Sequence, residues 1–159
     1  MALPPQKRRE VLFLLLYAQD FGSSSPDTLT SMIMSELSVT KKNITQIQEE
    51  VDVLRSHLTE IDDWIGTASG EYAFSRIPGI ERNVLRIALY EMHWQNALPA
   101  KVSISEAIRL TRKFATPEAA KFINGVLDTH YQRHRETIDS SVTQCEPSPV
   151  QLEEDESSC

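Results

Sequence analysis

Apolar residues recur every three or four positions through most of this chain, which is the spacing of one buried face of an α-helix. The clearest run lies between Thr40 and Ile65 and predicts a single long amphipathic helix. Its apolar positions are Ile44, Ile47, Val51, Leu54, Leu58, Ile61 and Ile65. No stretch alternates apolar and polar residues with β-branched enrichment, so the sequence predicts no strands.

Two further helices are predicted before that run. The first begins at Pro4 and Pro5 and ends at Gly22, which three serines follow. The second is expected to begin near Pro26 and Asp27. Its apolar stripe comprises Leu29, Met32, Ile33 and Leu37.

The segment from Ile80 to Trp94 is apolar around most of its circumference. Val84, Leu85, Ile87, Ala88, Leu89 and Met92 cover it on nearly every side. A helix of that kind belongs in the middle of a bundle. The segment is therefore expected to form the centre of the fold.

Local start signals mark the last two helices. Ser103 with Glu106 three residues later has the form of a capping box and predicts a helix start at Ser103. Thr116 followed by Pro117 predicts another start, with the final helix running to about Thr137.

The composition predicts one globular domain with an acidic tail. A chain of 159 residues with 40% apolar content suits a domain spanning residues 1–140. From Glu146 to Cys159 there are five acids and no bases. That end cannot bury enough apolar area to offset ordering, so residues 141–159 are expected to be a disordered acidic tail.

Charge is unevenly distributed along the chain. The formal net charge of −7 excludes a uniformly cationic surface for nucleic acid. Residues 10–75 hold eleven acids and three bases, whereas residues 99–145 hold seven bases and five acids. A polyanion is therefore expected to meet the two ends of the domain, not its middle.

The two termini give hints about the compartment. Cys145 and Cys159 lie in or beside the acidic tail, and a body without cysteine is consistent with the reducing cytoplasm. Lys7 to Arg9, followed by the apolar run Val11–Ala18, imitates a secretion signal. Glu10 interrupts that pattern, no cleavage site follows, and the run is too short to span a bilayer. The sequence therefore favours a cytoplasmic protein that does not contact membranes.

Basic residues and one aromatic residue form a candidate site for nucleic acid. On a helical wheel Arg109, Arg112 and Lys113 lie opposite the apolar face of their helix. Lys121 and Phe122 follow on the next helix, where a ring beside cations would suit stacking and phosphate contacts with single-stranded RNA. Each feature also has a structural interpretation, as a solvated helix face and as a ring packed against a neighbouring helix.

The N-terminal cations extend this candidate site. Lys7, Arg8 and Arg9 would neutralise phosphates by counterion release, although they also suit an ordinary charged terminus. His130 and His134 stand four residues apart, but no carboxylate gives the HExxH spacing of a zinc enzyme. The sequence also lacks GxxxxGK[ST], GxGxxG and GxSxG. We therefore expect no metal, no cofactor and no catalytic residues.

Three segments in the second half of the chain carry a family resemblance. They are Glu-Arg-Asn-Val-Leu-Arg-Ile-Ala-Leu-Tyr-Glu-Met (81–92), Val-Ser-Ile-Ser-Glu-Ala-Ile-Arg-Leu-Thr-Arg-Lys-Phe (102–114) and Lys-Phe-Ile-Asn-Gly-Val-Leu-Asp (121–128). In order and spacing they resemble the NusB family of bacterial transcription antitermination factors. Residues 7–18 look like the first helix of that family, whereas residues 22–75 match only by helix pattern.

The resemblance implies an all-α fold of two small helical bundles with about seven helices. It also implies a non-catalytic role in the RNA polymerase antitermination complex, paired with ribosomal protein NusE and bound to single-stranded boxA RNA. By position, the residues facing RNA would be Lys7, Arg9, Lys113, Lys121 and Phe122. Those at or near NusE would be Tyr17, Glu81 and Glu118.

Two other functions remain open at this point. A similar helical module forms the RNA-binding front of ribosomal RNA cytosine methyltransferases, and a protein-only helical adapter would leave the basic face solvated. Binding of a methyl donor would indicate the first function. Undetectable RNA binding in the presence of NusE would indicate the second.

Overall fold

The computed structural model describes residues 3–22, 25–70, 72–95 and 98–144. Over these ranges the chain forms seven α-helices, one short 3-10 helix (η1) and no strand. In chain order they are α1 (Pro5–Phe21), α2 (Pro26–Leu37), α3 (Lys41–Ser56), α4 (Leu58–Ala68), η1 (Phe74–Arg76), α5 (Gly79–Trp94), α6 (Ala100–Phe114) and α7 (Pro117–Gln144). The predicted all-α class is confirmed.

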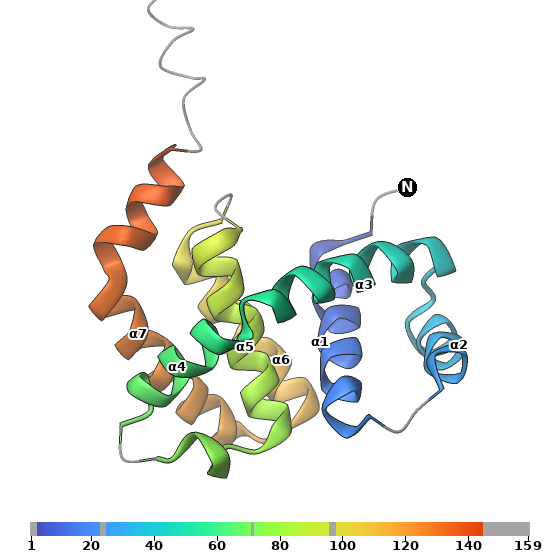
Figure 1. The fold of residues 1–159 in the computed structure, drawn as a ribbon, viewed down its shortest axis with the longest axis horizontal. Coiled ribbons are helices and arrows are strands. Elements are labelled where there is room, and N and C mark those ends of the chain that lie inside the picture. The colour runs from blue at the N-terminus through green and yellow to red at the C-terminus, as the bar shows by residue number, and fades with distance from the viewer. Residues whose placement is uncertain (1–2, 23–24, 71, 96–97, 145–159) are drawn as a thin grey trace, which may run out of the picture.

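The helices form two groups. In Figure 1, α1, α2 and α3 lie at one side of the molecule, and α4, α6 and α7 surround α5 at the other. Helix α3 extends from the first group to the second, and α1 packs against both α3 and α5. One continuous hydrophobic core runs through both groups.

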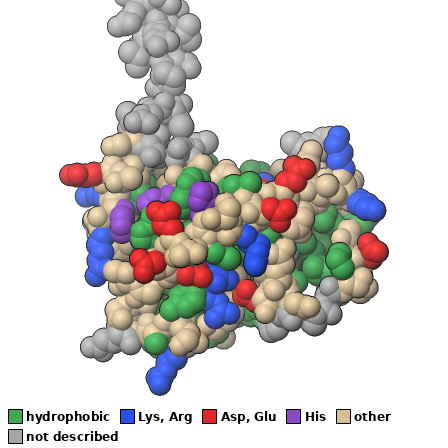
Figure 2. Space-filling view, viewed as in Figure 1, with side chains coloured by type: hydrophobic (Ala, Val, Ile, Leu, Met, Phe, Trp, Pro, Cys, Tyr) green, Lys and Arg blue, Asp and Glu red, His purple; other side chains and the backbone are tan. Residues whose placement is uncertain are grey.

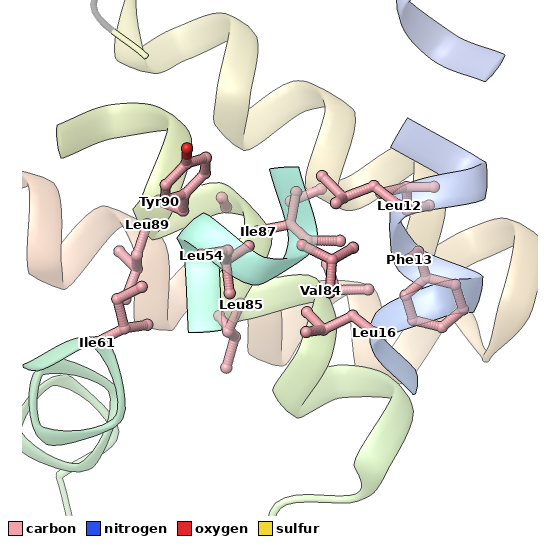
Figure 3. Close-up of a cluster of buried hydrophobic side chains, with 14 of the residues drawn as sticks. Leu12, Phe13, Leu16, Leu54, Ile61, Val84, Leu85, Ile87, Leu89 and Tyr90 are labelled. Carbon is pink, nitrogen blue, oxygen red and sulfur yellow. The ribbon is translucent and has the colours of Figure 1, made fainter. Parts of the chain in front are cut away.

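Helix α5 is the centre of that core, as its apolar circumference predicts. Every residue from Asn83 to Met92 is buried. Helices α1, α4, α6 and α7 all pack against it. Figure 3 shows Val84 and Ile87 of α5 among side chains of α1, including Leu12 and Leu16. Each fully buried aliphatic side chain of this kind contributes roughly 1.5–3 kcal/mol.

The predicted long helix between Thr40 and Ile65 is in fact two helices. His57 has φ −106° and ψ 7°, outside the helical range, and separates α3 from α4. Its ring stacks on Trp94 with centroids 4.1 Å apart. Prediction of one helix was wrong because the three-to-four-residue apolar spacing continues across the break. One non-helical residue does not disturb that spacing, although it redirects the chain onto α5.

The start of α6 also differs from its prediction. The helix begins at Ala100, so Ser103 lies inside the first turn and is buried. The Ser103 hydroxyl donates to the Glu91 carboxylate at 3.3 Å instead of capping the helix. The Ser103 side chain therefore makes a tertiary contact and does not form the predicted capping box.

The other local signals agree with the structure more closely. Gly22, after α1, adopts the left-handed conformation at φ 61°. The Thr116 hydroxyl accepts from the Ala119 backbone N–H at 3.1 Å, which is the expected cap of α7. Helix α7 continues past the predicted end at Thr137 to Gln144, with a kink at His134.

Two expectations concern residues that the structure does not describe. Residues 145–159 lie outside the described ranges, and they include Cys145, Cys159 and most of the predicted acidic tail. Among the described helices, none is both long enough and apolar enough to cross a membrane.

Candidate nucleic-acid interface

The outer face of α6 carries cations, as the helical wheel predicts. Arg112 and Lys113 are exposed, whereas Ala107 and Leu110 are buried against the core. Both cations lie in the last turn, where the negative end of the helix dipole favours positive charge. This part of the basic face therefore reaches solvent.

The start of α1 lies against that face of α6. Lys113 donates a hydrogen bond to Glu10, and the Arg109 Nη1 atom lies 3.4 Å from the other oxygen of that carboxylate. Arg109 Nη2 also donates to the Gln6 backbone carbonyl at 3.3 Å. Residues about a hundred positions apart thus meet, and Glu10 and Gln6 of α1 border the cationic face of α6.

Arg9 is placed differently from its prediction as an RNA-facing residue. Its side chain is buried, with the residue only 3% exposed. Its guanidinium donates to Glu91 and to Glu106, each at 2.9 Å. Burial alone would lower the pKa of Arg9, but the hydrogen bonds and charges of these two carboxylates outweigh it and raise that pKa. Arg9 joins α1 to α5 and α6 inside the protein.

Arg8 is also held by carboxylates. It forms a hydrogen-bonded ion pair with Glu50 of α3, and its Nη2 atom lies 3.4 Å from Glu91 of α5. Of the three adjacent cations, only the Lys7 side chain has no hydrogen bond or ion pair within the described part of the chain. Lys7 is thus the member of this run that is available to a ligand.

Lys121 and Phe122 lie in the first turns of α7, which packs along α6. Lys121 is exposed, and Phe122 is half-buried against the core. The Phe122 ring also contacts the Tyr72 ring, with centroids 5.3 Å apart and planes inclined at 50°. The structure therefore combines the two interpretations of Phe122, because one part of the ring packs and another borders the surface.

Tyr72 is a candidate that the sequence did not reveal. It precedes η1 and is 49% exposed, which is high for a large aromatic side chain. Together with Phe122 it forms an aromatic pair on which an unpaired base could stack. The signal was weak because Tyr72 lies in an irregular segment, and only the fold brings it to α7.

The three residues expected near a protein partner are only partly gathered. Tyr17 lies beside the start of α5, where a Cβ on Gly79 would come within 3.1 Å of the Tyr17 ring. Glu81 is in the same first turn of α5, half-buried, and burial raises the pKa of its carboxyl group. Glu118 is exposed in the first turn of α7, and no described contact joins it to the other two.

Three of the four histidines form a separate cluster with Trp64. His93 and His130 face each other with their Nε2 atoms 2.8 Å apart, and the His134 ring stacks on His130 at 4.2 Å. Trp64 stacks on His93, and Figure 2 shows the histidines together on one face. No group of three or more potential ligands suited to a metal ion occurs within the described ranges. This cluster joins α4, α5 and α7.

Burial sets the protonation state of this histidine cluster. It lowers the pKa of His93 to about 4, and the charge of His134 adds to this effect. It lowers the pKa of His130 to about 3, with further contributions from His134, His93 and Arg133. Both rings are therefore neutral near pH 7.

Comparisons with a family model and with known sequences point to the same protein family. The model of the NusB family matches residues 6–133. The chain is 32% identical over 122 residues to the transcription antitermination protein NusB of Desulforamulus reducens, covering 77% of this chain and 85% of that protein. It is 34% identical over 125 residues to the protein of the same name from Chlamydia pneumoniae, covering 79% and 78%.

Solved structures give the same result. NusB of T. maritima superposes with a TM-score of 0.70 at 28% identity, covering 87% of this chain and 99% of that one. A complex of the antitermination factors NusB and NusE with dsRNA gives a TM-score of 0.66 at 27% identity, covering 80% and 96%.

Proposed function

This chain belongs to the NusB family, and from that membership and the surface described above we propose that it is a non-catalytic transcription antitermination factor. In this role it pairs with ribosomal protein NusE and binds the single-stranded boxA element of nascent ribosomal RNA transcripts. It acts in the cytoplasm, within the RNA polymerase antitermination complex. The similar structure of NusB and NusE with dsRNA supports NusE and RNA as partners.

One observation carries the proposal. The hydrogen bond from Lys113 to Glu10 holds the cationic face of α6 against the start of α1. Helix α7, which bears Lys121 and Phe122, packs along α6. The exposed cations of α6 thus lie on the helix that packs against the helix bearing Lys121 and the Phe122 ring, and the start of α1, which bears Lys7, adjoins them. That combination suits single-stranded RNA, since phosphates bind the charges while bases stack on rings.

The residues divide into two groups by their placement. Contacts with RNA are assigned to the cations that reach solvent, and stacking is assigned to Phe122. These cations are Lys7, Arg112, Lys113 and Lys121. Arg8 and Arg9 position the start of α1 through their carboxylate partners. These roles belong to a domain spanning residues 1–140.

The NusE surface is assigned to Tyr17, Glu81 and Glu118. Tyr17 and the first turn of α5, which contains Glu81, lie next to each other. An aromatic ring beside a carboxylate suits a partner that presents a cation next to an apolar group. Glu118 would contribute from α7.

A titration of labelled boxA RNA with this protein, with and without NusE, tests the proposal. NusE is expected to tighten RNA binding, and the logarithm of the affinity should fall by about 0.7 per phosphate for each tenfold rise in salt. A scrambled RNA of the same length serves as the control. Absence of binding with NusE present would contradict the proposal, and binding of a methyl donor would indicate an enzyme instead.

A further inference from the structure

A second basic feature lies on the other side of α1 from α6. A groove of about 840 Å³ separates the start of α1 from the first half of α3, and Lys7, Arg8 and Lys42 line it. The only carboxylate in its lining is that of Glu50. In Figure 1 the start of α1 lies beside α3.

The charges of this groove are not balanced internally. Glu50, the one acid of the groove lining, forms an ion pair with Arg8 and so does not balance the charge of the lysines. The side chains of Lys7 and Lys42 have no ion pair or hydrogen bond within the described ranges, and the same holds for the side chain of the neighbouring Lys41. A protein of net charge −7 thus keeps an excess of positive charge at this place. That excess favours an anionic ligand.

Folding gives no reason for the lysines of α3. Lys41 and Lys42 occupy the first turn of α3, which contains no acid. The positive end of a helix dipole disfavours cations by roughly 0.3–1 kcal/mol each. The Thr40 hydroxyl already caps the helix by accepting from the Asn43 backbone N–H at 3.1 Å. The two lysines therefore stand where they weaken the helix slightly and gain no partner.

Polar side chains in the groove suit a nucleotide better than an acidic peptide. The side-chain amides of Asn43 and Gln46 line the groove and have no hydrogen bond within the described residues. An amide offers both donors and acceptors, as recognition of base edges and ribose hydroxyls requires. Lys7 also links this groove to the surface assigned to RNA above.

We propose that the groove between α1 and α3 binds the RNA strand where it continues past Lys7, with Lys42 contacting a phosphate. This inference rests on the proposed RNA-binding function. It lengthens the RNA site from α6 and α7, across the start of α1, to α3. RNA flanking the boxA core then adds affinity through its backbone.

The test compares a boxA core RNA with the same RNA extended by several uridines at both ends. In the presence of NusE, the wild-type protein should bind the extended RNA more tightly. Lys42→Ala should weaken binding of the extended RNA about fivefold at 0.1 M salt, which is the contribution of one phosphate contact. It should also reduce the slope of log affinity against log salt concentration by about 0.7. Affinity for the core RNA should stay unchanged.

Arg55→Ala is the matched control for net charge. Arg55 is exposed in the last turn of the same helix and has no ion pair among the described residues. It lies about 20 Å from Lys42 along α3, beyond the screening length of about 10 Å. This variant should bind both RNAs as the wild type does. Circular dichroism of Lys42→Ala should show an intact fold, since alanine favours helix.

Three results would overturn the inference. Lys42→Ala could leave the affinity for the extended RNA unchanged, or it could lower the affinity for both RNAs equally. It could instead weaken only the binding of a polyglutamate probe, which would assign the groove to an acidic protein segment. Failure of the wild-type protein to bind even the core RNA would refute the proposed function instead, so the two failures are distinguishable.

Discussion

Lys113 of α6 donates a hydrogen bond to Glu10 of α1, so an exposed cation of the proposed RNA surface already has an anion bound to it. The Glu10 carboxylate takes the place beside the ammonium group that a phosphate oxygen would occupy. It is itself buried, whereas the Lys113 side chain is 48% exposed. An RNA phosphate must therefore compete with Glu10 for this lysine.

Glu10→Gln should strengthen RNA binding. Glutamine retains the size of the side chain, and Arg109 keeps its ion pair with Glu106 at 3.1 Å. Lys113 would then be free for a phosphate, so affinity should rise several-fold at low salt and the salt slope should steepen by about 0.7. Fluorescence anisotropy titrations at several salt concentrations measure both quantities.

Glu60→Gln controls for the change in net charge. Glu60 is an exposed acid of α4 with no ion pair among the described residues. An equal gain in this variant would attribute the effect of Glu10→Gln to overall charge, and no gain in Glu10→Gln would show that its ion pair does not limit binding.

The aromatic pair of Phe122 and Tyr72 should contribute stacking energy. Phe122→Ala is expected to weaken RNA binding by about 1–3 kcal/mol, and Tyr72→Ala by a smaller amount because its ring supports Phe122 from outside the core. Anisotropy titration measures the affinity, and thermal melting measures the stability.

Because Phe122 also packs against the core, Phe122→Leu separates the two roles of the ring. Leucine fills much of the space but cannot stack. Relative to Phe122→Ala, it should therefore recover thermal stability without recovering affinity for RNA. Recovery of both would mean that Phe122 acts only through packing.

Some local features of this fold were predictable from the sequence. Thr116 and Pro117 gave the start of α7 correctly, because a cap and a proline act through the adjacent backbone alone. The circumference of α5 gave its central place for a similar reason, since burial on every side needs apolar residues on every side. In both cases the determining interactions are short-range or follow directly from composition.

The internal ion pairs were not predictable in the same way. Arg9 appeared to be a surface cation, yet Glu91 and Glu106 bind it from positions more than eighty residues away. A sequence pattern gives the polarity of a residue but not its partner. For the same reason, the contact of His93 on α5 with the histidines of α7 could not be predicted from the sequence.

Arg9→Met should destabilise the fold far more than it affects RNA contacts. The change leaves the buried Glu91 with only Arg8 as a cationic partner, at 3.4 Å. Loss of one member of a buried ion pair costs about 3–5 kcal/mol. Urea denaturation should show this loss, while the folded protein binds RNA nearly as the wild type does. The double variant Arg9→Met with Glu91→Leu should regain much of the stability.

Lys121→Ala provides the contrast to Arg9→Met. Lys121 is exposed, so its removal should lower RNA affinity and leave the urea midpoint unchanged. If Arg9→Met instead lowered affinity with an unchanged midpoint, Arg9 would be an RNA contact, as first predicted from the sequence.

Removal of the acidic residues 146–159 should tighten boxA binding at low salt. This segment carries five acids and no bases, and it would compete with RNA for the cationic surface. The gain should fade as salt rises, because screening weakens interactions between exposed charges. A full-length variant with these acids changed to their amides should match the truncation. Unchanged affinity at low salt would refute the competition.

Stability should fall as the pH drops from about 6.5 towards 4. His93 and His130 have folded pKa values of about 4 and 3, well below the ordinary value of 6.5. In this range the unfolded chain binds protons that the folded chain does not. Each histidine therefore lowers the free energy of unfolding by up to about 1.4 kcal/mol for each pH unit of acidification. Above pH 6.5 this contribution to stability is complete. Urea denaturation at pH 7, 6 and 5 should show the decline, and His130→Gln should flatten it because one such group is gone. An identical slope in both proteins would show that other groups cause the acid sensitivity.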